Sequence, residues 1–99
     1  MKFEISKRAR RQIEKISRWW MENRPAARTM FLDELAEAEQ RLRENPEVGI
    51  VYAQHRTGDV RRLQLSGSAH HIYYRYRRDR DELVVLTVWG APRERGPRL

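Results

Sequence analysis

The chain contains no cysteine, which excludes disulfide bridges and thiolate zinc sites and fits a reducing compartment. It also lacks a long apolar run, and its first residues, MKFEISKRARR, do not include the hydrophobic segment of a signal peptide. We therefore expect a cytoplasmic protein that does not enter a membrane. Lysine is scarce: it stands only at positions 2, 7 and 15, and the other 18 of the 21 basic residues are arginine.

Several motifs that are typical of catalytic, phosphate-binding or metal sites are missing as well. The sequence has no glycine-rich loop of the kind that cradles a phosphate. Ser66 and Ser68 stand in a predicted turn without the setting of a nucleophile. His70 and His71 are neighbours on a predicted strand, so they point to opposite faces and cannot easily bind one metal ion together. We expect neither a metal site nor another cofactor.

What remains is a small and highly charged globular domain. The 99 residues suit a single domain spanning 1–99, with 39% hydrophobic and 35% charged residues. The formal net charge is +7. Codon usage in a GC-rich genome is an alternative explanation for the preference for arginine over lysine, but it does not explain the excess positive charge. That excess indicates an anionic partner, either a nucleic acid or an acidic protein.

The first half of the chain predicts a short strand followed by two helices. Phe3 and Ile5 share one face of a strand over Lys2–Ile5, and Ser6 suits a helix N-cap. A spacing of three and four residues then predicts an amphipathic helix from Lys7 to Met21–Asn23. Pro25 is expected in the first turn of a second helix, which Asn45-Pro46 ends. Its apolar stripe consists of Ala27, Phe31, Leu35, Ala38 and Leu42.

The second half predicts a loop over residues 47–58 and then three strands. The strands are Val60–Leu65, His70–Arg77 and Leu83–Trp89, and residues 89–99 form an exposed basic tail. The last strand is apolar at nearly every position, which predicts a central place in the sheet. The fold class is therefore α+β with the order β-α-α-β-β-β. A helical hairpin packs on one face of a small, mostly antiparallel four-stranded sheet, and the other face stays open.

Alternation along the strands predicts what the open face presents. His70, Ile72, Tyr74 and Tyr76 should lie under the helices, because alternate residues share a face. Their neighbours should then point outward, and the residues after the last strand could fold over the same side. Such a basic, aromatic surface can bind phosphates and stack on flat groups, although charged residues on a sheet face also occur with no role beyond solvation. The predicted target-binding residues are Arg62, His71, Tyr73, Arg75, Arg93 and Arg95.

Trp19 and Trp20 form a second feature of interest. Adjacent helical residues are about 100° apart, so Trp20 extends the core stripe while Trp19 lies beside it. A position in the core or at its rim explains both. The alternative is an apolar contact for a protein partner.

The order of these segments resembles the RelE/ParE superfamily of bacterial toxins. The resemblance rests on NPEVG after the second helix, on VRRLQLSGSAHHIYYRY and on ELVVLTVWGAPRERGP. It implies the toxin half of a type II toxin–antitoxin pair, neutralised by an antitoxin whose disordered C-terminal segment folds onto the toxin. Trp19 and Trp20 are the predicted antitoxin contacts. RelE-like members cut mRNA on the ribosome, and ParE-like members poison DNA gyrase.

The resemblance also bears on the choice between the two branches. A RelE-like nuclease would use His71, Arg62 and Arg93, but Gln64 replaces an expected cation and Leu99 stands where a tyrosine often lies. The HIYYRY strand and the VWG turn look closer to ParE. We therefore expect a ParE-like toxin that acts on gyrase. The alternatives are a ribosome-dependent mRNA endonuclease and a passive nucleic-acid-binding domain, which has no recognised binding motif in its favour.

Overall fold

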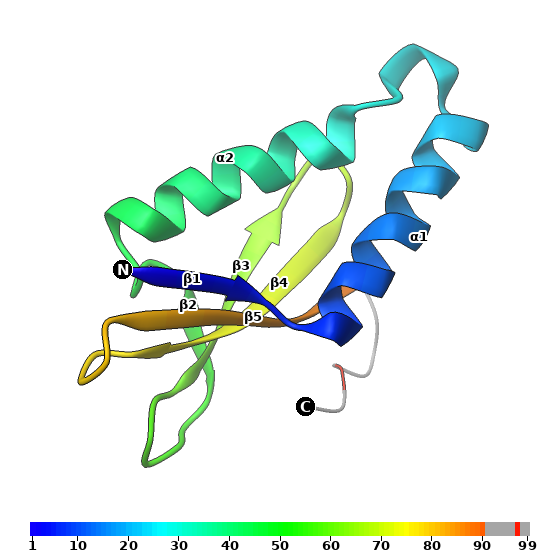
Figure 1. Cartoon of the computed structure of the whole chain (residues 1–99). Helices are drawn as coiled ribbons and strands as arrows, with labels where there is room; N and C mark the ends of the chain where they lie inside the picture. Colours follow the sequence, from blue (N-terminus) through cyan, green and yellow to red (C-terminus); the bar gives the residue numbers. More distant parts are fainter. Residues whose placement is uncertain (91–96, 98–99) are drawn as a thin grey trace.

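The computed structural model describes residues 1–90 and Pro97, and Figure 1 shows two helices over one sheet. The strands run in the order β1-β5-β4-β3-β2, with β1 parallel to β5 and the other neighbours antiparallel. This is the predicted α+β architecture with one strand more than expected. Its elements are β1 (Lys2–Ile5), α1 (Lys7–Asn23), the 3₁₀ turn η1 (Pro25–Ala27), α2 (Met30–Glu44), β2 (Ile50–Ala53), β3 (Val60–Leu65), β4 (His70–Arg77) and β5 (Glu82–Gly90).

The prediction of a four-stranded sheet was wrong because β2 lies in the segment predicted as a loop. Ile50–Ala53 pairs with β3 and forms one edge of the sheet. The strand has only four residues, three of them exposed, so it lacks the buried alternation that marks a strand in a sequence. An irregularity between Val51 and Ala53 also interrupts its register.

The helices begin and end largely where the sequence places them. The Ser6 side chain accepts a hydrogen bond of 3.0 Å from the Ala9 amide, which confirms the predicted N-cap of α1. The end of α2 at Glu44, just before Asn45-Pro46, is also as predicted. Pro25 does not begin the second helix, however. It begins η1, and α2 starts only at Met30, because the chain needs extra residues to turn between two helices that diverge (Figure 1).

The core lies between the sheet and the two helices. Ile72 and Tyr74 of β4 are buried there, as the alternation predicted, together with Phe31 of α2. His70 also faces the helices, because its ring centroid lies 5.3 Å from that of Phe31. The core residues are Ala9, Trp20, Phe31, Ala38, Leu42, Leu63, Leu65, Ile72, Tyr74, Leu83, Val85 and Val88.

β5 lies in the interior of the sheet, between β1 and β4, as its apolar sequence predicted. β1 pairs only with Glu82–Val85, so the rest of β5 needs other partners. Side chains at the start of α1 supply two of them: the Ser6 hydroxyl donates to the Leu86 carbonyl at 2.9 Å, and Gln12 Oε1 accepts the Val88 amide at 2.8 Å. Helix α1 therefore continues the edge of the sheet where β1 ends, which keeps buried backbone groups paired.

Candidate functional site

The sheet face opposite the helices, here called the open face, carries the predicted site. Directly opposed residues of neighbouring strands share a face. Arg62 opposes Tyr73, Gln64 opposes His71, and Val60 opposes Arg75, so all six lie on the side away from Ile72 and Tyr74. The structure thus brings Arg62, His71, Tyr73 and Arg75 together on one surface, which is the geometry that the sequence predicted.

Tyr73 is a correction within this arrangement. Its side of the sheet is as predicted, but the residue is only 2% exposed, so the expectation of an accessible ring was wrong. Tyr52 of β2 covers it, with ring centroids 4.8 Å apart and planes at 73°. Because the sequence did not predict β2, it did not predict that Tyr52 covers Tyr73. Tyr52 itself is 40% exposed and is the more accessible ring of the pair.

His71 is half-buried beside Tyr73, with ring centroids 6.2 Å apart. Burial lowers its pKa below the ordinary value of 6.5, and the positive charges of Arg62 and His70 lower it further. The imidazole is therefore mainly neutral near pH 7, a state in which it accepts a proton. Arg62 is half-buried in the same region and carries a planar guanidinium group that can bind an anion through two N–H donors.

Of the remaining predicted cations, the structure describes only Arg75. Arg75 is half-buried, and its Nε has no hydrogen-bond partner within residues 1–90. Arg93 and Arg95 lie outside the described residues, so their predicted return over the open face stays a prediction.

Two residues of the open face were missed by the sequence reasoning. Ile50 opposes Arg62 and therefore shares the open face, where it is 59% exposed. Tyr52 reaches the same face through its contact with Tyr73. The run IVYA after Gly49 carries a strand signal, being β-branched and aromatic, and could have located them.

The two tryptophans differ in exposure, as their different directions on the helix predicted. Trp20 is 9% exposed and belongs to the core, so it offers little surface to a partner. Trp19 is 47% exposed, packs edge-on against Trp20 and lies 5.5 Å from the Arg24 guanidinium. The exposed apolar area at the end of α1 therefore comes from Trp19, together with Met21, which is 41% exposed, and not from Trp20.

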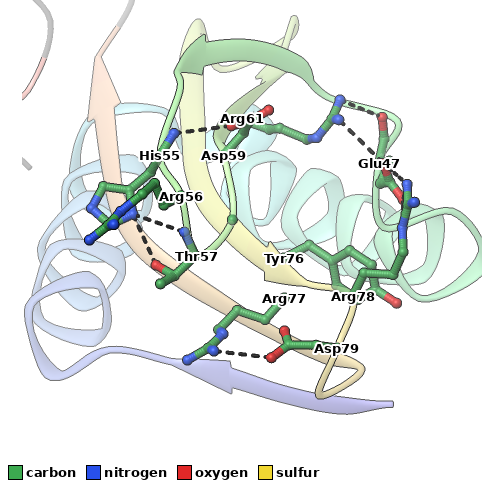
Figure 2. A pocket seen from close by; sticks show the side chains of 11 residues that line it. Glu47, His55, Arg56, Thr57, Asp59, Arg61, Tyr76, Arg77, Arg78 and Asp79 are labelled. Atoms are coloured by element: carbon green, nitrogen blue, oxygen red, sulfur yellow. Dashed lines mark hydrogen bonds and ion pairs between the residues drawn. The ribbon is translucent and has the colours of Figure 1, made fainter.

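A polar hollow of about 450 Å³ lies where the β2–β3 and β4–β5 connections meet (Figure 2). Glu47 is held there between two arginines, 3.4 Å from Arg61 Nη2 and 2.7 Å from Arg78 Nη2. Arg77 pairs with Asp79 at 3.1 Å. Because carboxylates already bind these guanidinium groups, the hollow is explained as an ion-pair network that ties the connections together.

A smaller cavity of about 210 Å³, the apolar groove, opens between β1 and the two helices. It exists because α1 and α2 diverge from their connection (Figure 1). Most of its lining is aliphatic or aromatic. The lining residues are Phe3, Ile5, Ile13, Leu32, Leu35, Ala36, Glu39, Leu42, Ile72 and Val85.

The described part of the chain shows neither a metal-binding cluster nor a membrane-spanning helix. There, no group of three or more histidine or acidic residues could hold a metal ion. No helix in that part combines the length and the apolar character needed to cross a membrane.

Comparison with known proteins shows which family the chain belongs to. The model of the family described as "ParE toxin of type II toxin-antitoxin system, parDE" matches residues 3–94. The chain belongs to this family. It is thus a type II toxin–antitoxin toxin of the RelE/ParE superfamily, as the resemblance implied.

A solved structure adds evidence on the fold of this family member. The crystal structure of the archaeal RelE–RelB complex from Pyrococcus horikoshii OT3 contains a chain that superposes with a TM-score of 0.64. The two chains are 16% identical, and the match covers 93% of this chain and 96% of that one. At this identity the likeness concerns the fold alone. A search of curated proteins gives no match.

Proposed function

We propose that this toxin arrests bacterial growth by poisoning DNA gyrase, which it binds through its open face and its C-terminal tail. The observation that carries the choice of gyrase over the ribosome is the family match, which is to ParE toxins over residues 3–94. Within the open face, neutral Gln64 opposes His71 where the RelE-like pattern has a cation. The positive balance of the chain adds electrostatic attraction to a gyrase–DNA complex.

Purified toxin, gyrase and supercoiled plasmid test this proposal directly. We expect the toxin to trap cleaved DNA and to induce the DNA-damage response in cells when it is expressed alone. Rapid loss of translated mRNA without cleaved DNA would instead assign the toxin to the ribosome.

The second candidate is a ribosome-dependent mRNA endonuclease, and His71 is the observation in its favour. A largely neutral imidazole near Arg62 is suited to take the proton of a 2′-hydroxyl while the arginine binds the phosphate. His71→Ala separates the candidates: it should abolish RNA cleavage but barely change gyrase poisoning. Gln64→Ala is the matched control, because it shortens the side chain opposite His71 on β3 and keeps the imidazole.

We propose further that a cognate antitoxin neutralises the toxin by placing an acidic, amphipathic segment on the helix side. The apolar groove supports this, because it can receive the apolar side chains of such a segment. Exposed Trp19 offers additional apolar area on α1. The RelE of the solved archaeal structure is itself in complex with RelB.

Ala36→Glu tests the groove, because Ala36 lines it while remaining exposed and its replacement leaves the core intact. A carboxylate there should repel an acidic segment and weaken antitoxin binding at least about tenfold in calorimetry. Gln54→Glu adds the same charge at an exposed loop position away from the groove and should bind normally. Equal affinity of both variants would move the antitoxin to another surface.

A further inference from the structure

Strand β2 gives the open face an apolar patch next to its cations. Ile50 opposes Arg62 and lies 59% exposed on that face. Tyr52 lies two residues further along β2, so strand alternation places it on the same side as Ile50, where its ring rests on Tyr73. The patch defined by Ile50, Tyr52 and Arg62 is here called the β2 patch.

The composition of the β2 patch is that of a protein-binding centre rather than a solvated strand. Large apolar side chains at an exposed sheet edge are unfavourable unless a partner covers them, and edge strands usually carry charges instead. An exposed tyrosine beside an arginine is typical of residues that dominate binding energy at interfaces. Val51, on the same strand, opposes Arg61 and faces the helix side, so it lies outside the patch.

We propose that the β2 patch is the central contact between this toxin and its target protein, an inference that rests on the function proposed above. The partner surface should present an apolar depression for Tyr52 and Ile50, with carboxylates facing Arg62. Charge favours such an acidic surface, because the toxin carries a net charge of +7. An aliphatic side chain such as Ile50 has no complement in a phosphodiester backbone, which favours a protein over a nucleic acid.

The patch is assigned to the target rather than the antitoxin because of where it lies. The apolar groove opens on the helix side, whereas Ile50 and Tyr52 lie on the opposite side of the sheet. An antitoxin segment in the groove therefore leaves the β2 patch to another protein. Tyr52, rather than the buried Tyr73, becomes the aromatic residue that the target contacts.

The test compares Ile50→Asp with Val51→Asp, the same substitution at consecutive exposed positions on opposite faces of one strand. Tyr52→Ala accompanies them. Growth arrest on expression, binding to purified gyrase subunits, ribosome-dependent RNA cleavage, antitoxin affinity and thermal unfolding are measured for the full-length chain. We expect Ile50→Asp and Tyr52→Ala to weaken growth arrest and gyrase binding at least about tenfold. Val51→Asp should match the wild type, and all three variants should bind the antitoxin normally.

Three outcomes would overturn the proposal, and a fourth would overturn only the function proposed above. Undiminished toxicity of Ile50→Asp with an unchanged Tm removes the patch from the target interface, even if Tyr52→Ala fails to fold. Loss of antitoxin binding instead assigns the patch to the antitoxin. Loss of ribosome-dependent RNA cleavage, with gyrase binding unchanged, assigns it to a nucleic acid. If the wild type arrests growth without binding gyrase, only the proposed function fails, because growth arrest still reports on the patch.

Discussion

At the scale of single residues, the protonation of His71 on the open face makes the stability of the fold depend on pH. Its folded-state pKa lies below 6.5, mainly because of burial, so the unfolded chain takes up a proton first as the pH falls. The stability that neutral His71 contributes is thus present above about pH 6.5 and is lost as the pH falls through the folded-state pKa.

His71→Gln should therefore become more stable relative to the wild type as the pH falls from 8 to 5. Urea unfolding at a series of pH values measures the difference, and NMR titration of the imidazole gives the pKa directly. Two stability curves that run parallel across this range would contradict the assignment.

Gly49 is a residue that the packing requires to be small. A Cβ there would lie 2.7 Å from the Tyr74 hydroxyl and 2.9 Å from the Arg62 carbonyl oxygen, both closer than real contacts allow. The Gly49 amide also donates to that hydroxyl at 2.9 Å, which fixes the start of β2 to β4. Burial raises the pKa of Tyr74, so the hydroxyl stays protonated at neutral pH.

Gly49→Ala should reduce the free energy of unfolding by about 1–3 kcal/mol, the usual cost of overpacking. Chemical denaturation measures this change, with Gln54→Ala at a nearby exposed position as the control. A shift below about 0.5 kcal/mol, normal for surface substitutions, would show that the backbone of β2 moves aside easily.

At the scale of elements, the β3–β4 turn is held by a helix. The Glu34 carboxylate of α2 accepts the Gly67 amide at 2.7 Å and the Ser68 amide at 2.8 Å. Such charge-assisted bonds are stronger than neutral ones. This one side chain therefore anchors the turn that precedes His70 and His71.

Glu34→Gln keeps the shape of the side chain but loses one of its two accepting oxygens. We expect a loss of about 1–3 kcal/mol in the free energy of unfolding, with faster hydrogen exchange at Gly67 and Ser68. Glu37→Gln, at an exposed position of the same helix, makes the same charge change and should have little effect. Unchanged exchange at both amides would mean that the turn holds its shape without α2.

At the scale of the whole molecule, a small domain with diverging helices leaves room for a partner to add stability. The apolar groove exposes side chains that a larger core would bury, and a ligand that binds only the folded state stabilises it by mass action. The antitoxin segment should act in this way.

Antitoxin at about 100 times its Kd should stabilise the toxin by about 2.7 kcal/mol. In a domain of this size that raises Tm by roughly 10–20 °C. Differential scanning fluorimetry measures the shift, and Ala36→Glu should show a smaller one at the same antitoxin concentration. An unchanged Tm at saturating antitoxin would mean that the segment does not bind the folded toxin.

The sequence by itself determined the two helices apart from the start of α2, four of the five strands and the two faces of β4. These follow from local rules: Ser6 caps a helix, Asn45-Pro46 ends one, and Ile72 and Tyr74 alternate with His71 and Tyr73. Arg62 and His71 could be placed on one face for the same reason.

Only the tertiary structure decided which side chains of that face are accessible. β2 is a short edge strand with three of its four residues exposed, so no buried alternation marks it in the sequence and it is defined by its pairing with β3. Tyr52 covers Tyr73 because that pairing brings their rings together. The exposure of a side chain depends on whether residues of neighbouring strands cover it. The side of the sheet to which it points depends only on the alternation of side chains along its own strand.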